Sequence, residues 1–351
     1  MRVVVTGATG NVGTSVLRAL AGHEDVTEIV GVARRQPGWT SPRTRWVQAD
    51  VSSSPLEPVF EGADAVIHLA WLIQPSRDEA TLAATNVRGS QRVFQAAAAA
   101  GVETLVYASS IGAYSPGPKD RRVGEDWPTE GIRTSFYSRH KAAVERSLDE
   151  LELAHPQLRV VRLRPGLIFK RDAGAEVRRY FAGPLLPARL VRPDLLPVFP
   201  DIPGLALQVV HGDDIAEAYR LALMTPTARG AYNVAAEPVL DVPALCRLFG
   251  ARPVRVPVAV VRTLASLSWR LHLQPTPPGW LDMGLEGPLM DTTRAREELG
   301  WKPRHDAGDA LLELLEGMRA GAGTDTPPLG PSSSGPLRLR ELITGLGRRG
   351  T

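Results

Sequence analysis

Short apolar runs alternate with longer segments rich in alanine and leucine over the first two-thirds of the chain. Most of these runs are continuously apolar, which indicates strands buried on both faces of a sheet. This order of elements is typical of βαβ units and a parallel sheet. The expected strands are residues 2–6, 28–33, 45–50, 65–70, 104–110 and 158–166. The expected helices are residues 11–22, 80–101 and 135–153.

The pattern changes after Pro165. Residues 182–204 are rich in proline and leucine without a clear period, which predicts a second lobe or a cap over a cleft. Strand and helix patterns return from residue 207, so we expect the chain to rejoin the sheet before a final helical part. We therefore predict an α/β fold, a Rossmann-type doubly wound parallel sheet with a smaller, interleaved C-terminal substrate-binding lobe. The expected ranges are 1–168 with about 206–234 for the Rossmann domain, 169–205 with 235–318 for the lobe, and 319–351 for a linker and flexible tail.

Composition narrows the class of protein. Hydrophobic residues make up 43% and charged residues 23% of 351 residues, as in an ordinary globular protein. The net charge is only +3 and the arginines are scattered among acids, so we expect no nucleic-acid partner. Cys246 is the single cysteine and the histidines lack metal-ligand spacing, so we expect no metal. No apolar stretch of about 18 residues or export signal is evident, which favours a cytoplasmic protein without a membrane partner.

Three glycines follow the first expected strand in the segment "TGATGNVG" and open the first expected helix. Gly7 permits a tight turn, Gly10 lets the backbone approach a pyrophosphate, and Gly13 lets the helix lie close to the sheet. The helix N-terminus, at Asn11 and Val12, supplies free N–H donors and a positive dipole end. The pattern therefore predicts a dinucleotide site.

A second candidate site lies in the segment "SFYSRHKAAVE". Tyr137 and Lys141 are four residues apart, so they share one face of the expected helix. A tyrosine phenol has a pKa of about 10, and a lysine ammonium nearby lowers it, which suits a proton donor or acceptor for a substrate oxygen. Ser110 ends a parallel strand and could hydrogen-bond the same oxygen. Only four lysines occur in the chain, so a lysine at position 141 is notable.

With these motifs in order, the chain resembles the extended short-chain dehydrogenase/reductases, the NAD-dependent epimerase/dehydratase family. The resemblance covers about residues 1 to 305. Its further signposts are Asp50 after the third strand, "HLA" (68–70), "NVRG" (86–89), "SS" (109–110), "RPG" (164–166), "VVHGDDIA" (209–216) and "DTTRAREELGWKP" (291–303).

The resemblance implies roles for these positions. Tyr137 would be the acid/base, Lys141 would hold the nicotinamide ribose, and Ser110 would orient the substrate carbonyl. The other positions that it places at the cofactor are Asp50 and Val51 at the adenine, Leu69 and Ala70 under the dinucleotide, Asn86 as support for the strand loops, Ser109 beside the cofactor, and Pro165. Dimerisation through the helices within 80–101 and 135–153 is common in this family.

The end of the second strand bears on the choice of cofactor. NAD enzymes usually carry an acid there, which accepts from the adenosine ribose 2′-OH. This chain reads "GVARRQ", with Arg34 and Arg35 and no acid. Guanidinium groups suit a 2′-phosphate, so the sequence favours NADP over NAD.

Three functions remain open at the level of sequence. The first is an NAD(P)-dependent oxidoreductase acting on an apolar ketone or secondary alcohol. The second is an NDP-sugar 4-epimerase that uses transient hydride transfer, and the third is a dinucleotide sensor without turnover. Sugar dehydratases in the family carry Thr-Asp-Glu where this chain has Ser110-Ile111-Gly112, and sugar-nucleotide enzymes often carry asparagine where it has Leu167. Lys170 and Arg171 are consistent with a nucleotide-sugar diphosphate as an alternative ligand.

Overall fold

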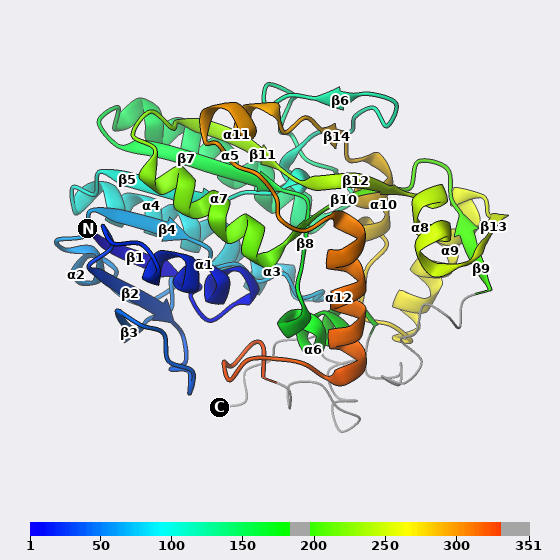
Figure 1. Cartoon of the computed structure of the whole chain (residues 1–351), viewed down its shortest axis with the longest axis horizontal. Coiled ribbons are helices and arrows are strands. Elements are labelled where there is room, and N and C mark those ends of the chain that lie inside the picture. The colour runs from blue at the N-terminus through cyan, green and yellow to red at the C-terminus, as the bar shows by residue number, and fades with distance from the viewer. Residues whose placement is uncertain (183–196, 331–351) are drawn as a thin grey trace.

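A seven-stranded sheet forms the centre of the structure, a computed structural model that describes residues 1–182 and 197–330 (Figure 1). Its strand order is β11-β7-β5-β4-β1-β2-β3, and every neighbouring pair is parallel. Because the strands are parallel, their carboxyl ends share one edge of the sheet. The strands are β1 (Arg2–Thr6), β2 (Glu28–Ala33), β3 (Thr44–Gln48), β4 (Ala65–His68), β5 (Thr104–Ala108), β7 (Arg159–Pro165) and β11 (Gly230–Val234).

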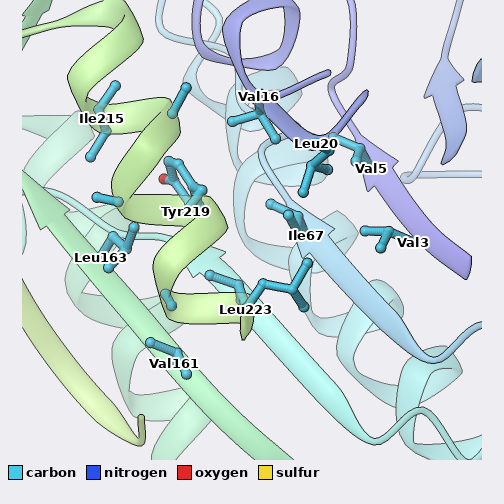
Figure 2. Close-up of a cluster of buried hydrophobic side chains, with 14 of the residues drawn as sticks. Val3, Val5, Val16, Leu20, Ile67, Val161, Leu163, Ile215, Tyr219 and Leu223 are labelled. Atoms are coloured by element: carbon cyan, nitrogen blue, oxygen red, sulfur yellow. The ribbon is translucent and has the colours of Figure 1, made fainter. Parts of the chain in front are cut away.

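Helices cover both faces of this sheet, as the continuous apolar strands predict. Val3 and Val5 of β1 face one layer and Val4 faces the other, following the two-residue period of a strand. The first layer holds α1 (Asn11–Ala21) and α7 (Gly212–Met224), and Figure 2 shows their apolar side chains packed over the strands. The second layer holds α2 (Glu57–Phe60), α4 (Ser90–Ala99) and α5 (Phe136–Ala154). The predicted Rossmann-type fold is confirmed.

The strand order reverses at β1, which has β2 on one side and β4 on the other. In doubly wound sheets, ligands bind outside the carboxyl ends of the strands at such a point. The connection from β4 to β5 runs through α3 (Glu79–Ala83), η1 (Ala84–Gly89) and α4. A 3-10 turn, η2 (Ile111–Ala113), follows β5.

The smaller lobe is built around a second sheet with the order β12-β10-β8. Two further pairs, β13 with β9 and β14 with β6, complete its strands. The bounds of these strands are β6 (Arg122–Val123), β8 (Leu167–Phe169), β9 (Val198–Asp201), β10 (Ala206–His211), β12 (Ala236–Asp241), β13 (Arg252–Arg255) and β14 (Leu289–Met290). The remaining helices are η3 (Arg171–Ala173), α6 (Gly174–Val177), η4 (Arg178–Ala182), α8 (Val242–Phe249), α9 (Val258–Arg270), α10 (Gly279–Glu286), α11 (Thr293–Glu298) and α12 (Ala307–Ala320).

The two lobes interleave along the chain. β8 and β10 belong to the second sheet, whereas α7 and β11 rejoin the central one, so the return to the Rossmann half begins at Gly212 and not near residue 206. Residues 183–196 of the proline-rich stretch lie outside the described residues. Within the part that the structure describes, no helix has the length and apolar character needed to cross a bilayer.

The chain after residue 318 differs from the linker and flexible tail expected over 319–351. Helix α12 continues to Ala320, and Gly321 ends it with a positive φ of 63°. Residues 322–330 then fold back against the Rossmann half, where Leu329 is fully buried. The segment 320–336, "AGAGTDTPPLGPSSSGP", is linker-like in composition, but specific contacts order its first part. Residues 331–351 lie outside the described residues.

Candidate functional site

The turn after β1 requires its glycines. Gly7 has a φ of 70°, and a Cβ atom added to it would lie 2.6 Å from the backbone nitrogen of Ala70. A Cβ atom on Gly13 would lie 2.3 Å from the carbonyl oxygen of Gly7. At Gly10, by contrast, the nearest atom would be 3.4 Å away, again the oxygen of Gly7. The turn is therefore tight at Gly7 and Gly13, whereas a Cβ atom at Gly10 would make only one contact, at van der Waals distance.

The N-terminus of α1 is suited to an anion. Gly10 is its N-cap and provides no side-chain acceptor, and the first turn contains no acid. Asn11 uses its side chain to donate to the carbonyl of Ile168 at 3.3 Å, and Val12 follows it in the first turn. The N–H groups of a first helical turn have no partner within the helix, and the helix dipole adds positive potential there.

Lys170 lies beneath this helix end. Its Nζ donates to the carbonyl of Asn11 at 2.6 Å and to the hydroxyl of Thr14 at 2.8 Å. Burial lowers the pKa of Lys170 to about 8, so the ammonium is still the main form at neutral pH. Arg171, beside it, approaches Glu316 at 3.8 Å. Lys170 is therefore hydrogen-bonded to the first turn of α1.

The positions expected at the adenosine end surround the carboxyl ends of β2 and β3. Arg34 and Arg35 are exposed immediately after Ala33, the last residue of β2. The Asp50 carboxylate accepts from the backbone N–H of Ser52 at 2.9 Å, which orders the turn after β3. Val51, the residue after Asp50, is buried.

The segment after β4 is held firmly against the glycine turn. Leu69 donates its N–H to the carbonyl of Thr6 at 3.0 Å, and Ala70 follows within contact of Gly7. The Asn86 side chain accepts from the N–H of Leu72 at 2.7 Å and donates to the carbonyl of Leu72 at 3.0 Å. Asn86 therefore fixes the path of the chain that runs through residues 69–72. Pro165 ends β7 at the same edge of the sheet.

Tyr137 and Lys141 lie on the first turns of α5, whose N-cap is Ser135. The Ser135 hydroxyl accepts from the N–H of Ser138 at 3.3 Å, which fixes where the helix begins. Ser110 caps η2 after β5 and is hydrogen-bonded to the Tyr137 side chain. The fold thus brings the three expected residues together from β5 and α5.

Lys141 is almost fully buried, at 2% exposure. Its Nζ donates to the carbonyl of Ala108 at 2.6 Å and lies 3.5 Å from the centre of the Trp71 ring. Burial holds its pKa well below the usual value, while Glu145 acts in the opposite direction. The ring of Trp71 shields the ammonium from water and attracts it by a cation–π contact.

Two tryptophans enclose Tyr137. The ring centres of Trp280 and Tyr137 are 5.0 Å apart, and those of Trp71 and Tyr137 are 5.8 Å apart. Burial raises the pKa of Tyr137 to about 12, although the hydrogen bond with Ser110 lowers it. The pKa of Tyr137 is therefore raised overall and not lowered as expected, because burial has the larger effect. At neutral pH the phenol therefore carries its proton and can act as an acid.

A buried network lies behind this group. Arg164 makes two hydrogen bonds to the Glu145 carboxylate, at 2.9 and 3.0 Å, and Arg162 makes a third at 3.0 Å. Burial alone would raise the pKa of Glu145, but these arginines and Ser109 together lower it to about 2. The network joins α5 to β7 and orients Ser109, since the serine hydroxyl donates to Glu145.

An open pocket of about 410 Å³ adjoins the enclosed phenol. Phe136, Trp269 and Trp280 form its apolar walls, and Arg77 and Arg139 line it as well. Trp280 is shared, because it lines the pocket and also packs against Tyr137. Trp280 thus separates the pocket from the ring of Tyr137 by a single aromatic side chain.

Sequence reasoning missed three residues of this region. Glu145 could have been found, since it lies one turn after Lys141 on the same helical face. Trp71 directly follows the "HLA" segment, so its place near the site was also open to inference. Trp280 gives no local signal, because tertiary folding brings it to Tyr137 from more than a hundred residues away.

A family model for the NAD dependent epimerase/dehydratase family matches residues 3–235. The fold and the arrangement of the candidate site agree with this match. The chain belongs to the NAD dependent epimerase/dehydratase family, a family of enzymes, and the resemblance derived from the motifs is confirmed.

Curated relatives extend over nearly the whole chain. An uncharacterized protein of Mycobacterium tuberculosis is 27% identical over 327 residues, which is 92% of this chain and 31% of the relative. The chain thus spans about a third of the length of that relative. A second uncharacterized protein of the same organism is 26% identical over 90% of this chain and 83% of the relative. The L-arabinose 1-dehydrogenase (NAD(P)(+)) of Haloferax volcanii is 39% identical, over 110 residues, 31% of this chain and 41% of the relative.

Solved structures show the same fold. The UDP-glucose 4-epimerase of Thermotoga maritima, solved with UDP-glucose, has a TM-score of 0.67 at 20% identity and covers 91% of this chain and 99% of its own. A short-chain dehydrogenase/reductase superfamily protein of Agrobacterium tumefaciens, solved with bound NAD, has a TM-score of 0.67 at 22% identity and covers 91% and 98%. At these identities the likeness concerns the fold.

Proposed function

We propose that the protein is an NAD(P)-dependent oxidoreductase that interconverts a ketone and a secondary alcohol, with Tyr137 as the acid/base. The observation that carries the proposal is the hydrogen bond between Tyr137 and Ser110 beside the buried ammonium of Lys141. The phenol keeps its proton at neutral pH because burial raises its pKa to about 12. It is therefore ready to protonate a carbonyl oxygen.

Each residue has a defined part in reduction. When bound, the reduced dinucleotide supplies a hydride to the carbonyl carbon. Ser110 hydrogen-bonds the carbonyl oxygen and orients it, and Tyr137 transfers its phenolic proton to that oxygen as negative charge develops there. Lys141 then stabilises the phenolate that remains by its positive charge. In alcohol oxidation the same proton returns to Tyr137.

For the cofactor we propose NADP in preference to NAD. Arg34 and Arg35 are exposed directly after β2, and β2 ends at Ala33 without an acid for a ribose 2′-OH. Guanidinium groups bind a 2′-phosphate through charge-assisted hydrogen bonds. The glycine turn and the N-terminus of α1 would receive the pyrophosphate of either dinucleotide.

An apolar substrate is supported by what surrounds Tyr137. The cluster around the phenol consists of Leu72, Leu82, Phe136, Trp71, Ile73, Trp280 and Met283. Lys170, the nearest sequence candidate for a diphosphate contact, donates instead to the glycine turn. An aromatic wall binds a ring system by burial of apolar area. The two arginines that also line the pocket are paired within the chain, Arg77 with the Trp269 carbonyl and Arg139 with Glu79.

The second candidate is an NDP-sugar 4-epimerase. It is favoured by the structural similarity to epimerases solved with UDP-sugars, including the Thermotoga maritima protein. Epimerisation needs the same proton transfer, but the hydride returns to the sugar and no dinucleotide is consumed. A sensor without turnover is disfavoured because Ser110, Tyr137 and Lys141 are brought together.

One assay separates these functions. The purified protein is incubated with NADPH or NADH and either apolar ketones or UDP- and dTDP-sugars, and absorbance at the reduced nicotinamide band is followed with sugar analysis in parallel. The proposal predicts consumption of NADPH with a ketone. Interconversion of sugars without consumption would establish the epimerase instead, and neither reaction would favour the sensor.

A further inference from the structure

Residues 322–329 form a segment that we name the C-terminal clasp. The clasp leaves the end of α12 at Gly321 and is tied at its start to the smaller lobe, since Ala175 donates its N–H to the carbonyl of Ala322 at 3.1 Å. It then runs towards the loop that follows β2 (Figure 1). The clasp therefore connects the smaller lobe to the Rossmann half.

Two contacts attach the clasp to the dinucleotide site. The Thr326 hydroxyl donates to the carbonyl of Thr9 at 2.9 Å, and Thr9 lies between Gly7 and Gly10 in the glycine turn. Trp39 donates its N–H to the carbonyl of Asp325 at 2.9 Å, and Trp39 lies in the loop after β2. In a Rossmann fold these two loops border the adenosine half of the dinucleotide. The clasp thus contacts both loops that border the adenosine half.

The fit between the clasp and these loops is close. A Cβ atom on Gly38 would lie 2.2 Å from an Asp325 carboxylate oxygen, so the Asp325 side chain lies directly against Gly38. Thr326 is 3% exposed and Leu329 is fully buried. Thr324 donates its N–H to the carbonyl of Leu329 at 3.1 Å, which closes the segment on itself. The clasp is therefore packed against the loops and hydrogen-bonded within itself.

The clasp contacts the glycine turn without occupying its N–H donors. It bonds to the Thr9 carbonyl, so the N–H donors of the first turn of α1 are left for an anion. No clasp atom comes within 4 Å of a Cβ position built on Gly10, where a pyrophosphate would approach the backbone. The same contacts can therefore persist with the dinucleotide bound.

We propose that the C-terminal clasp is part of the dinucleotide site and slows the release of the bound cofactor. The inference rests on the proposed dinucleotide binding, and holds for either reaction. Release requires the adenosine half to leave between the two loops, and the clasp must first detach from Thr9 and Trp39. Contacts that must break before release act mainly on the dissociation rate.

Two variants test the clasp, one that removes it and one that weakens it. A chain ending after Gly321 lacks the segment, and Thr326→Val removes only the hydroxyl that reaches Thr9. Dissociation of NADPH and NADH is followed by stopped-flow fluorescence after displacement with excess oxidised dinucleotide. We expect the dissociation rate to rise about tenfold or more in the truncated chain and about threefold to tenfold in Thr326→Val, in line with one net hydrogen bond.

The matched control is a chain ending after Gly330, which keeps the clasp and removes only later residues. It should release the dinucleotide at the full-length rate, and thermal unfolding checks that each variant is folded. Unchanged release of the dinucleotide from both clasp variants, or slower release after truncation, would refute the proposed role of the clasp. Either result would leave the proposed function intact. Failure of the full-length chain to bind either dinucleotide would overturn both.

Discussion

Tyr137 shows how burial sets the chemistry of a single residue. Trp71 and Trp280 exclude water from the phenol and raise its pKa to about 12, so its protonated form dominates at neutral pH. Helical spacing predicts that Lys141 lies beside Tyr137. It does not predict how far burial raises the pKa of Tyr137, because only the tertiary fold packs Trp280 against the phenol ring.

At the same scale, Arg34 and Arg35 test the choice of cofactor. Replacing both by alanine should weaken NADPH binding about 10-fold to 100-fold while NADH binding changes little, since only NADPH has a 2′-phosphate to lose its charge-assisted hydrogen bonds. Fluorescence titration of both dinucleotides gives the ratio of their dissociation constants. Arg146→Ala, an exposed arginine on α5, is the control. An unchanged ratio in the double variant would refute the proposed preference for NADP.

Among the elements, α5 carries both the candidate acid/base and its anchor. Glu145, one turn after Lys141, is clamped by Arg162 and Arg164 of β7. Because Glu145 is the carboxylate paired with the buried Arg164, its removal would leave that positive charge unbalanced, whereas Arg162 keeps Asp149 and Glu152. The position of Tyr137 therefore depends on an ion cluster at the centre of its own helix.

Glu145→Gln should lower the free energy of unfolding by about 3–5 kcal/mol at pH 7, measured by urea denaturation. The pKa of Glu145 is about 2 in the folded protein, below the ordinary value of about 4.3 for glutamate. Its stabilisation is thus complete above about pH 4.3 and is lost as the pH falls towards 2. The difference between the two proteins should therefore shrink in acid.

The control for this comparison is Glu150→Gln, an exposed position on the same helix. A surface substitution there should change the free energy of unfolding by less than about 0.5 kcal/mol. Equal stability of Glu145→Gln and the wild type at pH 7 would contradict the structural role given to the cluster.

For the whole molecule, the sequence predicted the layers well and the boundaries between lobes less well. Apolar runs and the glycine turn are local signals, so six strands of the central sheet and the helices 11–22 and 135–153 could be placed from them. The split of β8 and β10 into a second sheet depends on long-range pairing, which leaves no local pattern. The clasp was not predicted for a related reason. Its composition is that of a linker, and it is held in place by hydrogen bonds to Thr9 and Trp39, which are distant in the sequence.

The same distinction applies to the candidate site. The motifs predicted that Ser110, Tyr137 and Lys141 lie together, because helical spacing and the ends of strands give local sequence patterns. The apolar enclosure of Tyr137 comes from residues 71–73, 82, 136, 280 and 283, which only the folded chain assembles.

The central claim is that Tyr137 transfers the proton to a substrate oxygen, and Tyr137→Phe tests it most directly. The steady-state kcat/KM is measured beside the dissociation constant for NADPH, with Tyr219→Phe as the control. Tyr219 is a buried tyrosine whose hydroxyl has no hydrogen-bond partner among the described residues. We predict that Tyr137→Phe lowers kcat/KM by about 10²-fold to 10⁴-fold with nearly unchanged NADPH affinity, and that Tyr219→Phe changes neither. Wild-type turnover in Tyr137→Phe would contradict the mechanism.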